Sequence, residues 1–152
     1  MTYFQDLDRR TLVVTGEAVR AVGWLSSDHP FSQGPVPVAF LPALRKLRAG
    51  WHAILDILHW WPACMGVHRC EFCRDCFDNG DIAVPSGDLL FVSPAMLVHY
   101  VEVHEYLPPA DFVSAVLACP HPGSPEYSAA IVAIAERRDG DAWRITNPYR
   151  ET

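Results

Sequence analysis

The sequence predicts an α+β fold made of small antiparallel hairpins and three to four helices. Short apolar runs bounded by Gly, Pro and Ser are typical of strands and turns. Longer segments with apolar residues three and four apart begin at proline or end at glycine, as helices do. With 152 residues, 50% of them hydrophobic and 20% charged, the chain fits a single globular domain spanning residues 1–152.

The N-terminal third predicts a hairpin, a loop and a helix. Residues 12–25 contain two strand-like runs, LVVT and AVRAVGWL, around Gly16-Glu17, a glycine-first pair that suits a two-residue hairpin turn. The density of Ser, Gly and Pro makes residues 26–37 a loop. A helix follows at about residues 38–49, closed by Gly50. Its apolar face would consist of Phe40, Leu41, Leu44 and Leu47.

Residues 51–61 fit a helix and a strand almost equally well. Further along, DIAVP and LLFVS predict a hairpin around SGD, with Pro85 at an edge strand or a strand end. Ser93-Pro94 predicts a helix start, since serine suits the N-cap and proline the first helical position. That helix should end near Tyr106, before the prolines at 108 and 109. Two more helices are expected at about residues 109–118 and 124–137, then a short strand in AWRIT.

The stretch GVHRCEFCRDC, residues 66–76, has the spacing of a metal-binding knuckle. Cys70 and Cys73 form a C-x2-C pair, in which two thiolates on a tight turn can point at one ion. The helix downstream offers His99 and His104, whose H-x4-H spacing is within the range of zinc sites. Zinc, a borderline-soft ion, suits two thiolates and two imidazoles. We therefore predict a zinc-finger-like unit of knuckle, hairpin and helix at about residues 66–106.

The two histidines impose a condition on their helix. Positions five apart on an ideal α-helix lie about 140° apart, so His99 and His104 share a face only if the last turn tightens or opens. The sequence thus predicts a distorted turn at residues 103–106. Because a structural metal contributes to folding, loss of zinc should loosen residues 66–106 before the rest of the chain.

Other interpretations of the cysteines stay open. A lone C-x2-C arises by chance fairly often, and a histidine flanked by apolar residues is often a half-buried side chain. The run also resembles the start of a ferredoxin motif, but the required fourth cysteine is missing, and Cys119 lies far downstream. Cys64 and Cys119 fit small buried hydrophobic positions. His68 and Cys76 are reserve ligands.

An enzyme is the alternative to a structural zinc. A catalytic zinc keeps one position for water, and Glu102 or Glu105 would then act as a base beside it in a zinc-dependent hydrolase. The sequence lacks H-E-x-x-H, the zinc-deaminase order, G-x-S-x-G and the phosphate-binding loop motifs. The preferred interpretation is a non-enzymatic binding or accessory module without catalytic residues.

Charge argues against nucleic acid as a partner. The chain has 12 Lys and Arg against 18 Asp and Glu, and residues 75–136 contain no Lys or Arg against nine acidic residues, a formal charge of −9. Nucleic-acid affinity depends largely on Lys and Arg contacts with phosphates. This acidic and largely apolar part of the chain would suit binding of a basic protein or peptide, as in an immunity-type protein. The alternative is that it is simply a solvated surface. Candidate aromatic anchors are Trp24, Phe31, Trp60, Trp61, Tyr100 and Tyr106.

Localisation is expected to be cytoplasmic. The N-terminal stretch has no signal-peptide pattern, and the most apolar stretch, residues 51–67, contains Asp56 and Pro62 and is too short for a membrane helix. An odd number of cysteines argues against a disulfide framework.

Four segments resemble a family of small, uncharacterised bacterial proteins: YFQDL, AVGWLSSDHPFSQGPVPVAFL, GVHRCEFC and LLFVSPAMLVHYVEVHEYLPPADFVSAVLACP. That family shares V-G-W-L then H-P-F, H-x-C-x-F-C, and A-P-x-L-x-x-H-Y followed by H-x-Y-x-P-P. The resemblance covers residues 3–120 except for residues 47–65, which have no clear counterpart, and Ser93-Pro94 stands in place of Ala-Pro. It implies no activity. The motif positions that this resemblance implies are His68, Cys70, Cys73, His99 and His104.

Overall fold

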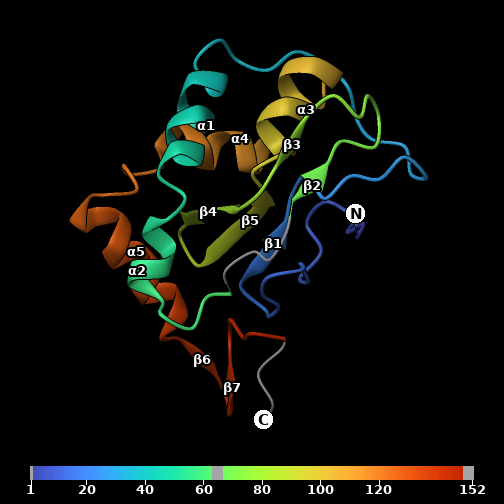
Figure 1. Cartoon of the computed structure of the whole chain (residues 1–152). Coiled ribbons are helices and arrows are strands. Elements are labelled where there is room, and N and C mark those ends of the chain that lie inside the picture. Colours follow the sequence, from blue (N-terminus) through green and yellow to red (C-terminus); the bar gives the residue numbers. More distant parts are fainter. Residues whose placement is uncertain (1, 63–66, 149–152) are drawn as a thin grey trace.

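A mixed three-stranded sheet forms the centre of the structure, a computed structural model that describes residues 2–62 and 67–148. The strand order is β1 (Val19–Ala21), β5 (Leu89–Pro94), β4 (Asp81–Ser86). Strand β5 is parallel to β1 and antiparallel to β4. The fold class is therefore α+β, as the sequence predicts (Figure 1).

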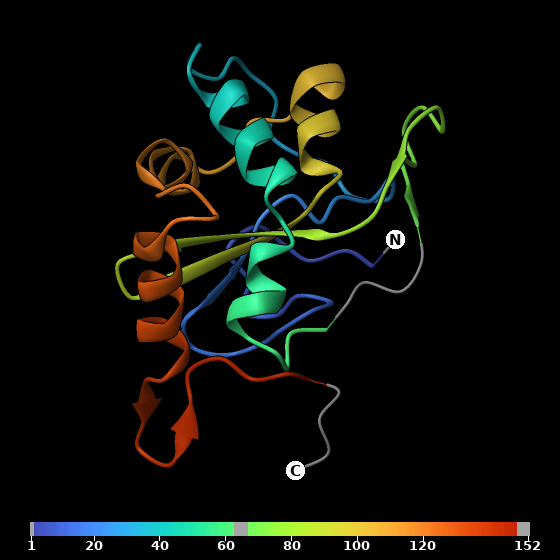
Figure 2. The same cartoon turned by 60° about the vertical axis from the view of Figure 1, so that its left-hand side comes forward.

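Helices cover both faces of this sheet. Figures 1 and 2 show α1 (Phe40–Ala49), α3 (Leu97–His104) and α4 (Ala110–Ala118) on one side, and α2 (Ala53–Ile57) and α5 (Pro125–Ala135) on the other. Because side chains alternate along a strand, β4 and β5 supply apolar residues to both layers. None of the helices in the described ranges combines the length and apolar character that crossing a membrane requires.

Two small ribbons complete the architecture. Strand β2 (His68–Arg69) pairs antiparallel with β3 (Phe77–Asp78). Strand β6 (Arg138–Asp139) pairs with β7 (Ala142–Trp143), which is the part of AWRIT that forms a strand. In Figure 2 the β2–β3 ribbon projects beside α3.

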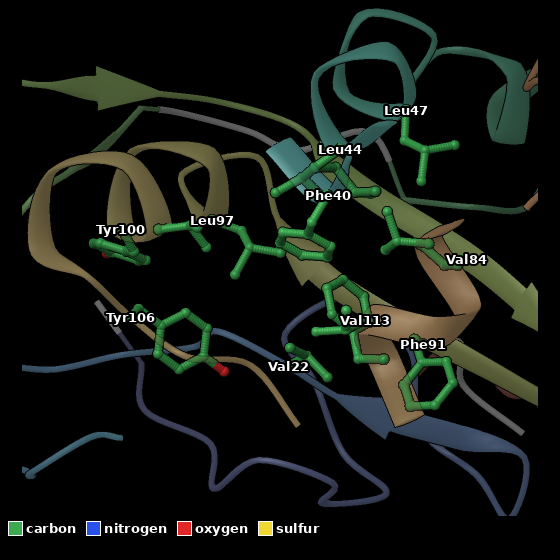
Figure 3. Close-up of a cluster of buried hydrophobic side chains, with 14 of the residues drawn as sticks. Val22, Phe40, Leu44, Leu47, Val84, Phe91, Leu97, Tyr100, Tyr106 and Val113 are labelled. Carbon is green, nitrogen blue, oxygen red and sulfur yellow. The ribbon is translucent and has the colours of Figure 1, made fainter. Parts of the chain in front are cut away.

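The core between the sheet and the α1, α3 and α4 layer positions the helix that carries the histidines (Figure 3). Leu97 and Tyr100 of α3 are 0% exposed, and α3 packs against α1. Burying side chains of this size stabilises a fold by roughly 1.5–3 kcal/mol each. The same core contains Val22, Phe40, Leu44, Val84, Phe91, Tyr106 and Val113.

The predicted N-terminal hairpin is wrong. Strand β1 forms, but residues 12–14 lie in no strand, and Thr15 makes only isolated bridges to Arg10 and Thr146. The edge of β1 that faces away from β5 is hydrogen-bonded to the N-terminal segment. Leu7 N–H donates to the carbonyl of Ala21 (2.6 Å), and Ala21 N–H donates to that of Asp8 (2.7 Å). The LVVT run is therefore excluded from the ladder.

Gly16 serves a close approach in place of the expected hairpin turn. Its φ is 145°, and a Cβ there would lie 2.1 Å from the carbonyl oxygen of Arg144. Only glycine allows the C-terminal segment to pass this close.

The second predicted hairpin is confirmed. Strands β4 and β5 pair from Asp81 with Pro94 to Ser86 with Leu89, leaving a two-residue turn at Gly87 and Asp88. Strand β4 lies at the edge of the sheet, the position that Pro85 indicates.

The helix start expected at Ser93-Pro94 is wrong. Both residues belong to β5, and α3 begins at Leu97 with no side-chain cap at Met96. The hairpin ladder extends through them, and Ala95 N–H continues it by donating to the carbonyl of Gly80 (2.9 Å). Cross-strand hydrogen bonds thus override the local capping preference.

The other predicted helices form. Helix α5 begins as the sequence indicates, with Ser124 accepting a hydrogen bond from Tyr127 N–H (3.2 Å) and Pro125 in its first turn. Helix α2 adds a short helix, residues 53–57, within the stretch that the pattern left undecided. Cys64 lies outside the described residues.

Asp81 makes stability depend on pH. It is 2% exposed, and among the described residues its Oδ1 has no hydrogen-bond partner. Burial raises its pKa to about 7 from 3.8. Because the folded state then holds the proton more tightly than the unfolded state, stability is greatest below pH 4 for this group and falls as pH rises through 7.

We expect Asp81→Asn to raise the free energy of unfolding by up to about 4 kcal/mol at pH 8 and by less than half as much at pH 5, where the carboxyl is ionised in the unfolded chain and still protonated in the folded one. Urea unfolding at both pH values measures the difference. The matched control is Asp88→Asn, an exposed carboxylate. A gain of equal size at pH 5 and pH 8 would contradict this account.

Candidate metal centre

The cysteine knuckle closes the β2–β3 ribbon. Cys70 N–H donates to the carbonyl of Cys76 (2.9 Å), which extends the ladder by one step beyond β2 and β3. Arg74 N–H turns back to the carbonyl of Cys70 (3.0 Å), and Arg74 itself has a φ of 59°. This tight turn brings the thiols of Cys70 and Cys73 to one side.

The last turn of α3 opens, which confirms the predicted distortion. Glu105 has a left-handed conformation with a φ of 56°, and its N–H donates to the carbonyl of Tyr100, five residues back. Tyr106 N–H donates to the same carbonyl at 3.1 Å. An ordinary α-helix bonds four residues back, so this turn is wider. As a result, the rings of His99 and His104 lie 5.0 Å apart.

These two turns bring together the four residues that the sequence indicates as metal ligands. Cys70 Sγ lies 3.3 Å from His104 Nε2, and Cys73 Sγ lies 3.3 Å from His99 Nε2. All four ligand atoms lie within 4.8 Å of one another. A tetrahedral zinc ion with its usual bond lengths separates sulfur and nitrogen ligands by about 3.5 Å. The four side chains are therefore close enough to hold one metal ion.

The reserve ligands stand outside this group of four. His68 lies on β2, half-buried. Cys76 faces Cys70 across the ribbon, and burial raises the pKa of its thiol, followed by the charges of Asp78, Cys70 and Cys73. Cys76 is thus a neighbour of the site without joining the four-atom cluster.

Burial shifts the pKa values of Cys70 and His99 in opposite directions. It raises the pKa of the Cys70 thiol, against the backbone N–H groups of Cys73 and Phe72, which lower it. It lowers the pKa of His99, and the charge of His104 acts in the same direction. The imidazole is therefore kept in the neutral form that binds metals, whereas the thiols must release protons to an incoming ion.

The loop at residues 26–37 straps the end of α3. Gln33 Nε2 donates to the carbonyl of His104 (3.0 Å), and Gly34 N–H donates to that of Glu105 (3.0 Å). Leu107 N–H returns a bond to the carbonyl of Ser32 (2.8 Å). The strap fixes the backbone of one ligand and of the residue that opens the turn.

Phe72 is the other part of the site that ligand spacing does not reveal. Its ring lies 5.4 Å from that of His104, 5.9 Å from Tyr100 and 5.1 Å from Phe31. It therefore packs between the knuckle, the helix and the strap. The one signal for it in the sequence is its place between Cys70 and Cys73 in the H-x-C-x-F-C motif.

The N-terminal segment also reaches the end of α3. The hydroxyl of Tyr106, which is 0% exposed, donates to Asp6 Oδ2 (2.7 Å). Asp6 Oδ1 accepts from the N–H of Gly23, next to β1 (3.0 Å). One carboxylate thereby ties the helix end to the strand region of the sheet.

The two glutamates of the catalytic alternative lie at the surface. Glu102 forms an ion pair with Arg45 of α1 (2.5 Å), and both side chains are about half exposed. Glu105 is exposed at the helix end. The ion pair with Arg45, which joins α1 and α3, therefore explains where the Glu102 side chain lies.

The family model for a domain of unknown function, DUF7919, matches residues 2–117, about three quarters of the chain and all four clustered ligands. No curated protein and no solved structure matches the chain.

The ligand assignment predicts which substitutions remove the metal. Cys73→Ala and His99→Ala should each lower the zinc content well below one per chain and lower the melting temperature, because a three-ligand site binds more weakly and metal binding contributes to folding. Elemental analysis and thermal unfolding of the same samples measure both effects.

Cys119→Ala is the matched control. Cys119 is half-buried, its thiol donates to the carbonyl of Pro120, and burial raises its pKa to about 11. This variant should keep its zinc and lose only the stability of one small buried group. Equal metal content in all three variants would refute the assignment.

Proposed function

We propose that this chain, which belongs to the DUF7919 family, is a non-enzymatic binding or accessory module in which a structural zinc ion fixes a β-ribbon for recognition of a protein or peptide. The observation that carries the proposal is that four protein ligand atoms lie within 4.8 Å of one another. Four such ligands fill a tetrahedral shell, the arrangement of structural zinc sites.

The chemistry of the ligands favours zinc. Two thiolates exclude the hard ions magnesium and calcium, which prefer oxygen ligands. Two imidazoles with two thiolates suit a borderline-soft ion that takes tetrahedral geometry without redox chemistry. The free thiols of Cys70, Cys73, Cys76 and Cys119 suit a reducing compartment, and the proposal places the protein in the cytoplasm.

A hydrolase receives less support. It requires one ligand to leave so that water can bind, and a base beside that water. His99 and His104 both turn a ring nitrogen to a cysteine sulfur at 3.3 Å. Glu102, the candidate base within α3, forms an ion pair with Arg45.

The outer face of the β2–β3 ribbon is the proposed recognition surface. Because side chains alternate, Cys70 and Cys76 point to the metal side, whereas Val67, Arg69 and Phe77 point to the other side. Val67 is 61% and Phe77 66% exposed, although both are large apolar residues. The metal thus anchors one face of the ribbon and leaves an apolar face in solvent, where apolar residues often mark interfaces.

The charge around the site is mixed. Asp75 and Glu105 are exposed carboxylates that would suit a basic partner, whereas Arg69 and Arg74, also exposed, would suit acidic groups of that partner. An immunity-type protein would use the exposed carboxylates. Most of the aromatic residues considered as anchors are instead in the core, with Trp24, Tyr100 and Tyr106 at 0% exposure and Trp61 at 4%. Two exposed aromatic residues outside that candidate set are Phe77, on the ribbon, and Trp143, on β7 and 44% exposed.

Cobalt substitution distinguishes a structural site from a catalytic one. We expect the cobalt-loaded protein to show the intense visible bands of tetrahedral, thiolate-bound cobalt and to show no change on addition of millimolar azide, because four protein ligands leave no position for an anion. The variant His104→Ala, which opens one position, serves as the positive control. An azide-dependent spectrum of the unmodified chain would indicate an open, catalytic site.

Peptide selection tests the recognition surface. Peptides selected from a displayed random library against the zinc-loaded protein should be rich in basic and apolar residues and bind Phe77→Ser at least tenfold more weakly. Leu117→Ser, which changes a 45% exposed leucine on α4, is the matched control and should bind normally. Selected peptides that bind Phe77→Ser as tightly as the unmodified protein would contradict this surface.

A further inference from the structure

We propose that Cys70 and Cys76 are an oxidisable pair whose disulfide removes one ligand from the metal site and releases the ion. The inference rests on the proposed structural metal, but it concerns Cys76, to which that function gives no role. Its class of reactant is a hydroperoxide.

The register of the ribbon places the two cysteines opposite each other. His68 pairs with Asp78 and Arg69 with Phe77, so the next pair in the same register is Cys70 with Cys76. The hydrogen bond from Cys70 N–H to the carbonyl of Cys76, at 2.9 Å, shows that the ladder reaches them. Directly opposed residues in antiparallel strands have Cα atoms about 4.5–5.5 Å apart and side chains on the same face. That separation lies within the range of disulfides, about 4.4–6.8 Å.

Exposure separates the roles of the two sulfurs. Cys70 is 0% exposed and lies in the core cluster, whereas Cys76 is half-buried at the margin of that cluster. Cys73 is also half-buried, but its sulfur faces His99. Cys76 is therefore the reachable sulfur of the knuckle that the four-atom cluster does not use.

The chemistry balances with one hydroperoxide per disulfide. The thiolate form of Cys76, a small fraction because burial raises the pKa of this thiol, attacks one peroxide oxygen, the O–O bond breaks, and the products are a sulfenic acid and a water or alcohol. The Cys70 sulfur then attacks the Cys76 sulfur, an S–S bond forms, and the hydroxyl leaves as water with a proton. With Cys70 held as a metal-bound thiolate, the two sulfurs together would lose two electrons to the peroxide, which would take up the Cys76 proton and one proton from solvent to give water and a second water or alcohol.

Disulfide formation must weaken the metal site. The Cys70 sulfur, bonded to Cys76, is no longer a thiolate, and thiolates are the form that binds zinc. Cys73, His99 and His104 would then hold the ion with three ligands. Because the knuckle and α3 are joined through these ligands, release of the ion also frees the ribbon that carries Phe77.

The experiment treats the zinc-loaded full-length protein with hydrogen peroxide and follows zinc with a chromogenic chelator, while mass spectrometry of non-reduced peptides locates the disulfide. We expect one zinc released per Cys70–Cys76 bridge, and recovery of zinc binding after a thiol reductant. Cys76→Ser should keep its zinc initially and release it at least tenfold more slowly. Cys119→Ser, a half-buried thiol outside the ribbon, should behave as the unmodified chain.

The outcomes separate this inference from the proposed function. A Cys70–Cys73 bridge, a bridge to Cys64, or zinc release from Cys76→Ser as fast as from the unmodified chain would overturn the inference. None of these outcomes would contradict the proposed structural role of zinc. A purified protein without zinc would instead refute the proposed function, and a Cys70–Cys76 bridge in that metal-free protein would still support the pairing.

Discussion

The convergence of two cysteine sulfurs and two imidazole nitrogens on one point is the interaction on which this region depends. The ligands come from a ribbon and a helix that also meet through Phe72, whose ring lies beside those of Tyr100 and His104. Two sulfur–nitrogen contacts of 3.3 Å partner these four groups with one another, and an ion bonded to all four would join them into one shell. The five-residue spacing of His99 and His104 makes a further demand, which the left-handed Glu105 meets by opening the helix end.

The surroundings of the cluster link it to the rest of the fold. The strap at residues 26–37 bonds the backbone of His104, and Tyr106 bonds Asp6 beside β1. The ring of Phe72 packs against Phe31 of the strap and against His104 of α3. The cluster of four ligands therefore lies where three segments distant in the sequence meet, so ordering by a bound ion would extend to the strap and the N-terminal segment. The exposed face of the ribbon is presented by this arrangement.

Local patterns predicted much of the site and only part of the fold. The spacings C-x2-C and H-x4-H identified the four clustered residues, because two ligands that are close in the sequence can reach one ion only at certain separations. The β4–β5 hairpin was also predictable, since its turn and alternation are local. The pairing of residues 4–8 with β1 was not, because it joins distant segments and displaces the LVVT run. Ser93-Pro94 misled for a related reason: the ladder hydrogen bonds that hold it in β5 come from the partner strand. Likewise, Gln33 reaches the site only through the fold, and so do the contacts of Phe72 with Phe31 and Tyr100.

The central claim is that a closed shell of four protein ligands holds one structural zinc ion. Elemental analysis combined with a zinc-edge X-ray absorption spectrum of the purified protein tests it most directly, since the two together report the ion and its bonded atoms. The account predicts one zinc per chain with two sulfur and two nitrogen neighbours at about 2.3 and 2.0 Å. An oxygen neighbour in that shell, or a protein purified without metal, would contradict it.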